Sequence, residues 1–163
     1  MNSSHSGVIA LAGLVAVVVV AVDQFTKVIA RNSISGNDDV ELLGGVITIV
    51  DVRNSGIAFG QLAGGGALVA VIVALAVGAL LWYFLSHLAT PMIWLATGLV
   101  IGGAVGNIID RVRAGAVTDF IKLPHWPAFN FADAAITIGV IALVLLVEID
   151  ARRRRKLELP SAT

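Results

Sequence analysis

Two acidic residues, Asp119 and Asp133, stand in apolar sequence and are the strongest candidates for chemistry in this chain. Phe120 and Ile121 follow the first acid, and fourteen uncharged residues, 134–147, follow the second. A carboxylate beside hydrocarbon is difficult to keep ionised, so acids in membrane segments are functional candidates. Two carboxylates that meet can share one proton, as they do in aspartyl peptidases. The pattern therefore predicts acid–base chemistry of that kind at a membrane surface.

The composition indicates an integral membrane protein with one domain. Of the 163 residues, 58% are hydrophobic and 13% are charged, whereas soluble domains have about 25% charged residues. Cysteine is absent, which excludes disulfides and thiolate chemistry. The three histidines, His5, His87 and His125, are scattered, so we expect no metal site and no cofactor. The formal net charge is zero, and we expect no nucleic-acid partner.

Long uncharged stretches predict an all-α membrane protein with four transmembrane helices and a small extracytoplasmic β-hairpin. The helices are expected at about residues 7–27, 62–86, 91–109 and 131–148, all within a peptidase domain formed by residues 1–150. We expect residues 32–60 to form the extracytoplasmic loop and residues 151–163 to form a basic cytoplasmic tail. The first helix is expected to stay in the mature protein, because its start lacks the Lys or Arg of a cleaved signal peptide.

Two glycine patterns indicate how these elements pack. Gly44 and Gly45 separate two short apolar stretches, which is typical of a β-hairpin. A lone hairpin is marginally stable in water, so we expect it to rest on the bilayer or on the helix ends. Gly98, Gly102 and Gly106 recur at intervals of four, the spacing that brings membrane helices close together.

Several polar residues near the predicted helix ends have a purely structural interpretation. Asp23 and Lys27 are four apart, so they share a helix face and could form an ion pair. Asn130 stands three residues before Asp133, close to a capping-box pattern. Asp133 could therefore be a helix-start acid that the helix dipole stabilises.

Four membrane crossings would nevertheless place all the unusual polar residues on one membrane face. These residues are Asp23, Lys27, Asn54, Asn107, Asp110, Arg111, Asp119, Asn130 and Asp133. Independent structural roles would have scattered them over both faces, so one shared site is favoured. The basic run Arg152–Lys156 directly follows the last helix, which favours cytoplasmic termini and an extracytoplasmic site.

Five segments resemble one known family. They are residues 23–27 (DQFTK), 53–59 (RNSGIAF), 102–111 (GGAVGNIIDR), 117–121 (VTDFI) and 127–133 (PAFNFAD). In this order they are similar to the motifs of the lipoprotein signal peptidases (signal peptidase II), which are bacterial membrane aspartyl peptidases.

The resemblance implies a multi-pass endopeptidase in the bilayer of the bacterial cytoplasmic (inner) membrane, and we expect this protein to act as a monomer. Its substrate would be a diacylglyceryl-modified prolipoprotein, cut just before the lipidated cysteine by water that the catalytic dyad, Asp119 and Asp133, activates. The candidate substrate-binding residues are Asn54, Gly56, Asn107, Arg111 and Asn130. The three asparagines could instead orient the dyad, because amides both donate and accept hydrogen bonds. The candidate supporting residues are Asp23, Lys27 and Asp110.

The chain departs from the family pattern in two places. Only thirteen residues separate Asp119 from Asp133, which predicts a reduced flap over the substrate. Ile57 and Gly60 stand where alanine and serine are common in the family. Both departures concern the shape of the pocket around the dyad.

Three other functions are compatible with a four-helix membrane protein. A transporter or proton channel would need ionisable residues deep in its helices, and the predicted helix interiors here contain none. A metal-dependent phospholipid enzyme would need clustered acids or histidines, and only His125 falls on the site face. A scaffold subunit is the third alternative. Cleavage measured in the presence of a chelator would separate the peptidase from the metal-dependent enzyme.

Overall fold

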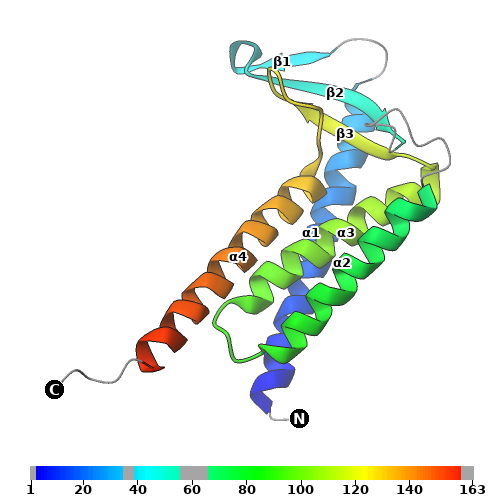
Figure 1. Cartoon of the computed structure of the whole chain (residues 1–163). Coiled ribbons are helices and arrows are strands. Elements are labelled where there is room, and N and C mark those ends of the chain that lie inside the picture. Colours follow the sequence, from blue (N-terminus) through cyan, green and yellow to red (C-terminus); the bar gives the residue numbers. More distant parts are fainter. Residues whose placement is uncertain (1–2, 35–38, 56–65, 159–163) are drawn as a thin grey trace.

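The structure is a computed structural model of the chain, and it describes residues 3–34, 39–55 and 66–158. The described residues form four α-helices, namely α1 (Ser3–Ser33), α2 (Gly66–Ser86), α3 (Ile93–Ala114) and α4 (Phe131–Glu158). In the same part of the chain, three strands form one antiparallel sheet, namely β1 (Val40–Leu42), β2 (Ile47–Asn54) and β3 (Val117–Lys122). Figure 1 shows this sheet across one end of the helices, with the start of α1 and the end of α4 at the other end.

Among the residues that the structure describes, three helices are long and apolar enough to cross a bilayer. The apolar helical segments are His5–Ser33, Ile93–Ala114 and Phe131–Arg153. The part of α2 whose side chains are described contributes a shorter apolar segment, Leu75–Ser86. Large apolar side chains such as Leu14 of α1 and Val144 of α4 are exposed, which is how a membrane helix faces lipid.

Two helices continue beyond their predicted ends. α1 reaches Ser33 instead of residue 27, so Asp23 and Lys27 lie inside the helix. α4 continues through the basic run to Glu158, where the sequence suggests a separate tail. Arg, Lys, Leu and Glu are good helix formers, so the helix persists after its apolar part ends. Residues 62–65 of the predicted second helix lie outside the described residues.

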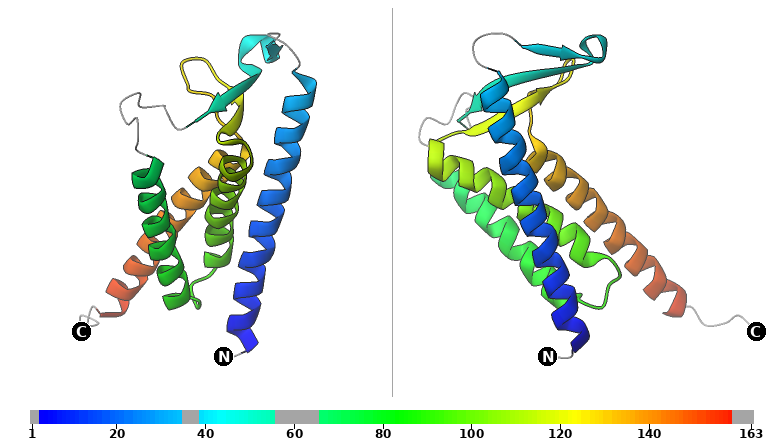
Figure 2. Two further views of the ribbon diagram at one scale, coloured as in Figure 1. Left: turned by 90° about the vertical axis from the view of Figure 1, so that its right-hand side faces the viewer. Right: turned by 180° about the vertical axis from the view of Figure 1, so that it is seen from behind.

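Helix α3 packs closely against both α1 and α4 (Figure 2). A Cβ atom added at Gly98 would lie 2.7 Å from the carbonyl oxygen of Ala12 in α1, and Gly102 is equally crowded by that helix. On the other side, a Cβ at Gly103 would lie 2.5 Å from the carbonyl oxygen of Ala132 in α4. The close helix packing predicted from the glycine spacing is therefore confirmed.

The predicted hairpin is present, but it does not stand alone. Strands β1 and β2 are joined by a tight turn, Leu43–Gly45, in which Gly44 and Gly45 have φ angles of 69° and 87°. The segment that follows α3, which the sequence suggests is a loop, instead forms β3 and pairs with β2. Asp119 lies opposite Val52 in this pairing. The third strand gives the hairpin the support that a two-stranded ribbon lacks.

The chain then returns along β3 before α4 begins. The N–H of Ile121 donates to the carbonyl oxygen of Phe129 over 2.9 Å, and the N–H of Phe129 donates back to Ile121 over 2.9 Å. This return places Asn130, and with it the start of α4, directly beside β3. The short interval between Asp119 and Asp133 is thus folded back on itself.

Candidate active site

Asp119 is held in the middle of β3 with 2% of its surface exposed. Its Oδ2 accepts a hydrogen bond from Nδ2 of Asn54 in β2 over 2.9 Å. Its Oδ1 accepts one from Nδ2 of Asn130, just before α4, over 2.7 Å. Two amides from different elements therefore fix the orientation of this carboxyl group.

Asp133 lies in the first turn of α4 and completes a capping box. Its Oδ2 accepts the backbone N–H of Asn130 over 3.2 Å, and its own N–H donates to Oδ1 of Asn130 over 3.0 Å. The capping pattern predicted from the sequence is therefore confirmed. The same carboxylate also accepts Nδ2 of Asn107 in α3 over 2.8 Å through its Oδ1. Asp133 therefore both caps the start of α4 and belongs to the polar network.

A continuous path of hydrogen bonds joins the two acids. Asn130 donates its side-chain amide to Oδ1 of Asn107 over 3.2 Å as well as to Asp119. Asn107 in turn donates to Asp133. Asn107 and Asn130 are both nearly or fully buried, with 7% and 0% exposure. The two acids, separated along the chain, therefore belong to one site.

Lys27 is a fully buried cation that contacts this network through Asn107. Its Nζ lies 2.8 Å from Oδ2 of Asp23, 3.1 Å from Oδ2 of Asp110 and 3.1 Å from Oδ1 of Asn107. An ammonium group has three N–H donors, and each has a partner here. Because a buried charge is tolerated only when it is paired and hydrogen-bonded, this arrangement fixes α1 against α3.

Lys27, Asp23 and Asp110 form a buried ion cluster. Its two acids also contact the other elements of the site. Oδ1 of Asp23 accepts the backbone N–H of Ala132 in the first turn of α4 over 3.0 Å. Oδ2 of Asp110 accepts the backbone N–H of Thr118 in β3 over 3.1 Å. The cluster therefore links the elements that carry Asp119 and Asp133 to α1 and α3.

Arg111, another predicted site residue, touches this network only at its edge. Arg111 is exposed, and its guanidinium group makes a long 3.5 Å hydrogen bond to the carbonyl oxygen of Asn107. Asp110 is paired with Lys27 and not with its neighbour Arg111. Gly56 lies outside the described residues. A substrate-binding role for Arg111 and for Gly56 remains a prediction.

Burial raises the pKa of the Asp119 carboxyl group above its ordinary value. Loss of water around the charged form is the largest cause, and the negative charge of Asp133 adds to it. The amide hydrogen bonds from Asn54 and Asn130 favour the charged form and oppose the shift. Asp119 therefore holds its proton to higher pH than an exposed aspartic acid. Among the described residues, no group of three or more acidic or histidine side chains could hold a metal ion.

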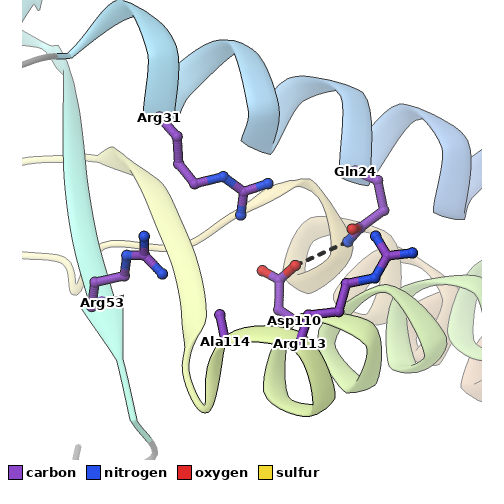
Figure 3. A pocket seen from close by; sticks show the side chains of 6 residues that line it. All are labelled: Gln24, Arg31, Arg53, Asp110, Arg113 and Ala114. Atoms are coloured by element: carbon purple, nitrogen blue, oxygen red, sulfur yellow. Dashed lines mark hydrogen bonds between the residues drawn. The ribbon is translucent and has the colours of Figure 1, made fainter.

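Two residues next to the site, Gln24 and Arg31, have no role predicted from the sequence. Gln24 donates through Nε2 to Oδ1 of Asp110 over 3.1 Å and to the carbonyl oxygen of Gly106 over 3.2 Å (Figure 3). The sequence could have indicated a role for Gln24, because this residue lies inside the 23–27 segment that resembles a family motif. Arg31 donates to Oγ1 of Thr118 over 3.0 Å, and no local pattern indicates that contact.

The fold and these contacts define a class of helical membrane proteins with a carboxylate–amide site where a small sheet meets the helix ends. The family described as signal peptidase (SPase) II has a model that matches residues 15–149. The chain therefore belongs to the signal peptidase II family, the membrane proteases of lipoprotein processing.

Relatives and a solved structure agree with this assignment. The lipoprotein signal peptidase of Halothermothrix orenii is 36% identical over 132 residues, which cover 81% of this chain and 91% of the relative. That of Syntrophomonas wolfei is 39% identical over 138 residues, covering 85% and 93%. A bacterial membrane enzyme solved by the in meso method at 1.9 Å resolution is similar to this fold, with a TM-score of 0.78 and 35% identity. The match covers 85% of this chain and 93% of that chain.

Proposed function

We propose that this protein is an aspartyl endopeptidase of the bacterial cytoplasmic (inner) membrane. It removes the signal peptide from diacylglyceryl-modified prolipoproteins, cutting before the lipidated cysteine. The observation that carries the proposal is that one residue, Asn130, hydrogen-bonds both Asp119 and Asp133. The dyad and its amide partners all come from one chain, so we expect the monomer to be active.

In the proposed reaction, one carboxylate activates water and one carboxylic acid activates the peptide bond. Ionised Asp133 takes a proton from the water, whose oxygen attacks the carbonyl carbon. Protonated Asp119 donates a hydrogen bond to the carbonyl oxygen, which becomes negative as the tetrahedral intermediate forms. The nitrogen then gains a proton from the dyad as the C–N bond breaks, leaving a carboxyl group on the signal peptide and a free amine on the cysteine.

Two environments support this division of roles. Burial and the charge of Asp133 raise the pKa of Asp119, which favours Asp119 as the partner that carries the proton. Asp133 lies at the N-terminus of α4, where the dipole favours a negative charge, and it accepts N–H groups from Asn107 and Asn130. A pair of unlike carboxyl groups of this kind is what the proposed reaction needs.

The three asparagines are assigned to positioning the dyad. Asn54, Asn107 and Asn130 each direct a side-chain amide at one of the two acids, which supports this role over direct contact with the substrate backbone. Arg111, which is exposed next to the network, and Gly56 are proposed to contact the substrate instead.

Exchange of either acid for its uncharged amide tests the dyad. Asp119→Asn and Asp133→Asn should each abolish cleavage of a lipidated precursor in a gel-shift assay, with helix content by circular dichroism unchanged. Asp51→Asn, which alters an exposed acid on β2, is the matched control and should cleave like the unchanged protein. Full cleavage by either dyad variant would falsify the mechanism.

We further propose four membrane crossings, with the site on the extracytoplasmic face and both termini in the cytoplasm. The supporting feature is the basic run Arg152–Lys156, which lies at the end of the molecule opposite the sheet (Figure 1). Because the chain has no cysteine, single cysteines report the topology directly. In intact spheroplasts, a membrane-impermeant maleimide should label Glu41→Cys in β1 and leave Arg155→Cys unlabelled until the membrane is opened. The reverse pattern would place the site in the cytoplasm.

A further inference from the structure

A pocket of about 230 Å³ lies beside the ion cluster, between α1, the end of α3 and the sheet. Its lining residues are Gln24, Arg31, Arg53, Asp110, Arg113 and Ala114. These three arginines line the pocket from three different elements, α1, β2 and α3. Figure 3 shows the side chains of Arg31 and Arg53 pointing toward each other and that of Arg113 extending toward Gln24.

The positive charge of this pocket is not neutralised by the part of the chain that the structure describes. Within those residues, none of the three guanidinium groups forms an ion pair with a carboxylate. The one acid in the lining, Asp110, already binds Lys27, Gln24 and the N–H of Thr118. Like charges that share a pocket repel one another, so an anion would stabilise the arrangement.

Helix-end electrostatics accounts for only two of the three arginines. Arg31 lies in the last turn of α1 and Arg113 in the last turn of α3, where a cation is favoured by the helix dipole. Arg53 belongs to a strand, yet its side chain lines the same pocket. The helix dipole therefore does not explain why a third arginine lines this pocket.

We propose that Arg31, Arg53 and Arg113 form a binding site for a phosphate group, the headgroup phosphate of an anionic phospholipid. Guanidinium groups match phosphate oxygens in geometry as well as charge. The two helices that carry Arg31 and Arg113 are candidate membrane spans that end here, which puts the pocket at the depth of lipid headgroups. Its volume is below that of sites for drug-sized ligands, so it suits a headgroup and leaves the acyl chains outside.

The phosphate site is separate from the dyad, and its assignment does not rest on the proposed peptidase activity. Arg31 binds the side chain of Thr118, whereas the next residue of β3, Asp119, turns to Asn54 and Asn130. Successive side chains of a strand point to opposite faces, so β3 lies between the two sites. A bound phosphate would join β2 to α1 and α3 and so stabilise the sheet on the helix ends.

Calorimetric titration of the delipidated full chain in maltoside detergent tests the site. The probes are dihexanoyl-phosphatidylglycerol, inorganic phosphate at constant ionic strength, and dihexanoylglycerol, which has the same acyl chains without phosphate. The test variant, Arg53→Gln/Arg113→Gln, changes two exposed side chains and leaves the Arg31–Thr118 hydrogen bond in place. The control variant, Arg153→Gln/Arg155→Gln, removes two exposed charges from the opposite end of the molecule.

We expect the phosphatidylglycerol probe to bind the unchanged protein and to raise its Tm. The test variant should bind it at least ~10-fold more weakly, because charge-assisted contacts are lost, and the control variant should bind it normally. If inorganic phosphate binds much more weakly than the phosphatidylglycerol probe, the natural ligand is a lipid headgroup. If the two bind with equal affinity, the ligand is free phosphate and the lipid assignment is wrong. Equal binding of dihexanoylglycerol, equal loss in both variants, or no binding of either phosphate probe would overturn the proposal.

Discussion

Asn130 donates its side-chain amide to Asp119 over 2.7 Å, across eleven positions of the sequence. The backbone N–H of the same residue donates to Asp133 over 3.2 Å. The relative orientation of the two acids therefore depends on one asparagine, which is itself fixed by Asn107 and by the start of α4. This dependence leads to the first of four predictions.

Asn130→Ala should lower kcat/KM by about 10- to 150-fold, because one hydrogen bond to a charged or partly charged group contributes ~1.5–3 kcal/mol. Most of the loss should appear in kcat, since the proposed role is to position the dyad and not to bind substrate. Initial rates of precursor cleavage measure both parameters. The matched control is Asn32→Ala, an exposed asparagine of α1, which should leave both parameters unchanged. A loss confined to KM would contradict the positioning role.

The pH dependence of cleavage should report the raised pKa of Asp119. The active form needs Asp119 protonated, so the rate should fall as the pH rises through that pKa, above the range of an ordinary aspartic acid. Asn54 favours the charged form of Asp119 through its amide hydrogen bond. Asn54→Ala should therefore move the descending limb to still higher pH while lowering the maximum rate. A descending limb that does not move in Asn54→Ala would contradict the assignment of the proton to Asp119.

Lys27→Met should destabilise the protein by about 3–5 kcal/mol, because it leaves Asp23 and Asp110 buried without their cation. Thermal unfolding in detergent, followed by intrinsic tryptophan fluorescence, measures the change. Lys122→Met is the control, since this lysine is exposed on β3. If the two variants unfold at the same temperature, the buried ion cluster does not support the fold as described.

Gly102→Ala should weaken the packing of α3 on α1 by about 1–3 kcal/mol, the usual range for overpacking. The added Cβ would lie 2.7 Å from Cβ of Val19, which forces the two helices apart. Gly13→Ala in α1 has open space around it and removes a glycine from a helix, so it should not destabilise the protein. Thermal unfolding in detergent measures the unfolding temperatures of both variants. Equal temperatures would refute the packing role of Gly102.

Local patterns in the sequence determined the class of the protein and the candidate acids. Apolar stretches of the right length indicate membrane helices because insertion depends on composition within a short window. The Asn130–Asp133 capping box was also predictable, since its partners are three residues apart and both lie at one helix end. The glycine spacing in α3 likewise indicated close packing before any partner helix was known.

Only the tertiary structure decided which residue holds which acid. Asp119 finds Asn54 across 65 positions, and Lys27 finds Asn107 across 80. The strand that carries Asp119 exists because β2 pairs with it, although the same segment alone suggests a loop. Such contacts arise when distant segments are packed together, and no local period or composition encodes them. The sequence therefore supplied the chemical groups, and the packing of α1, α3, α4 and the sheet made them one site.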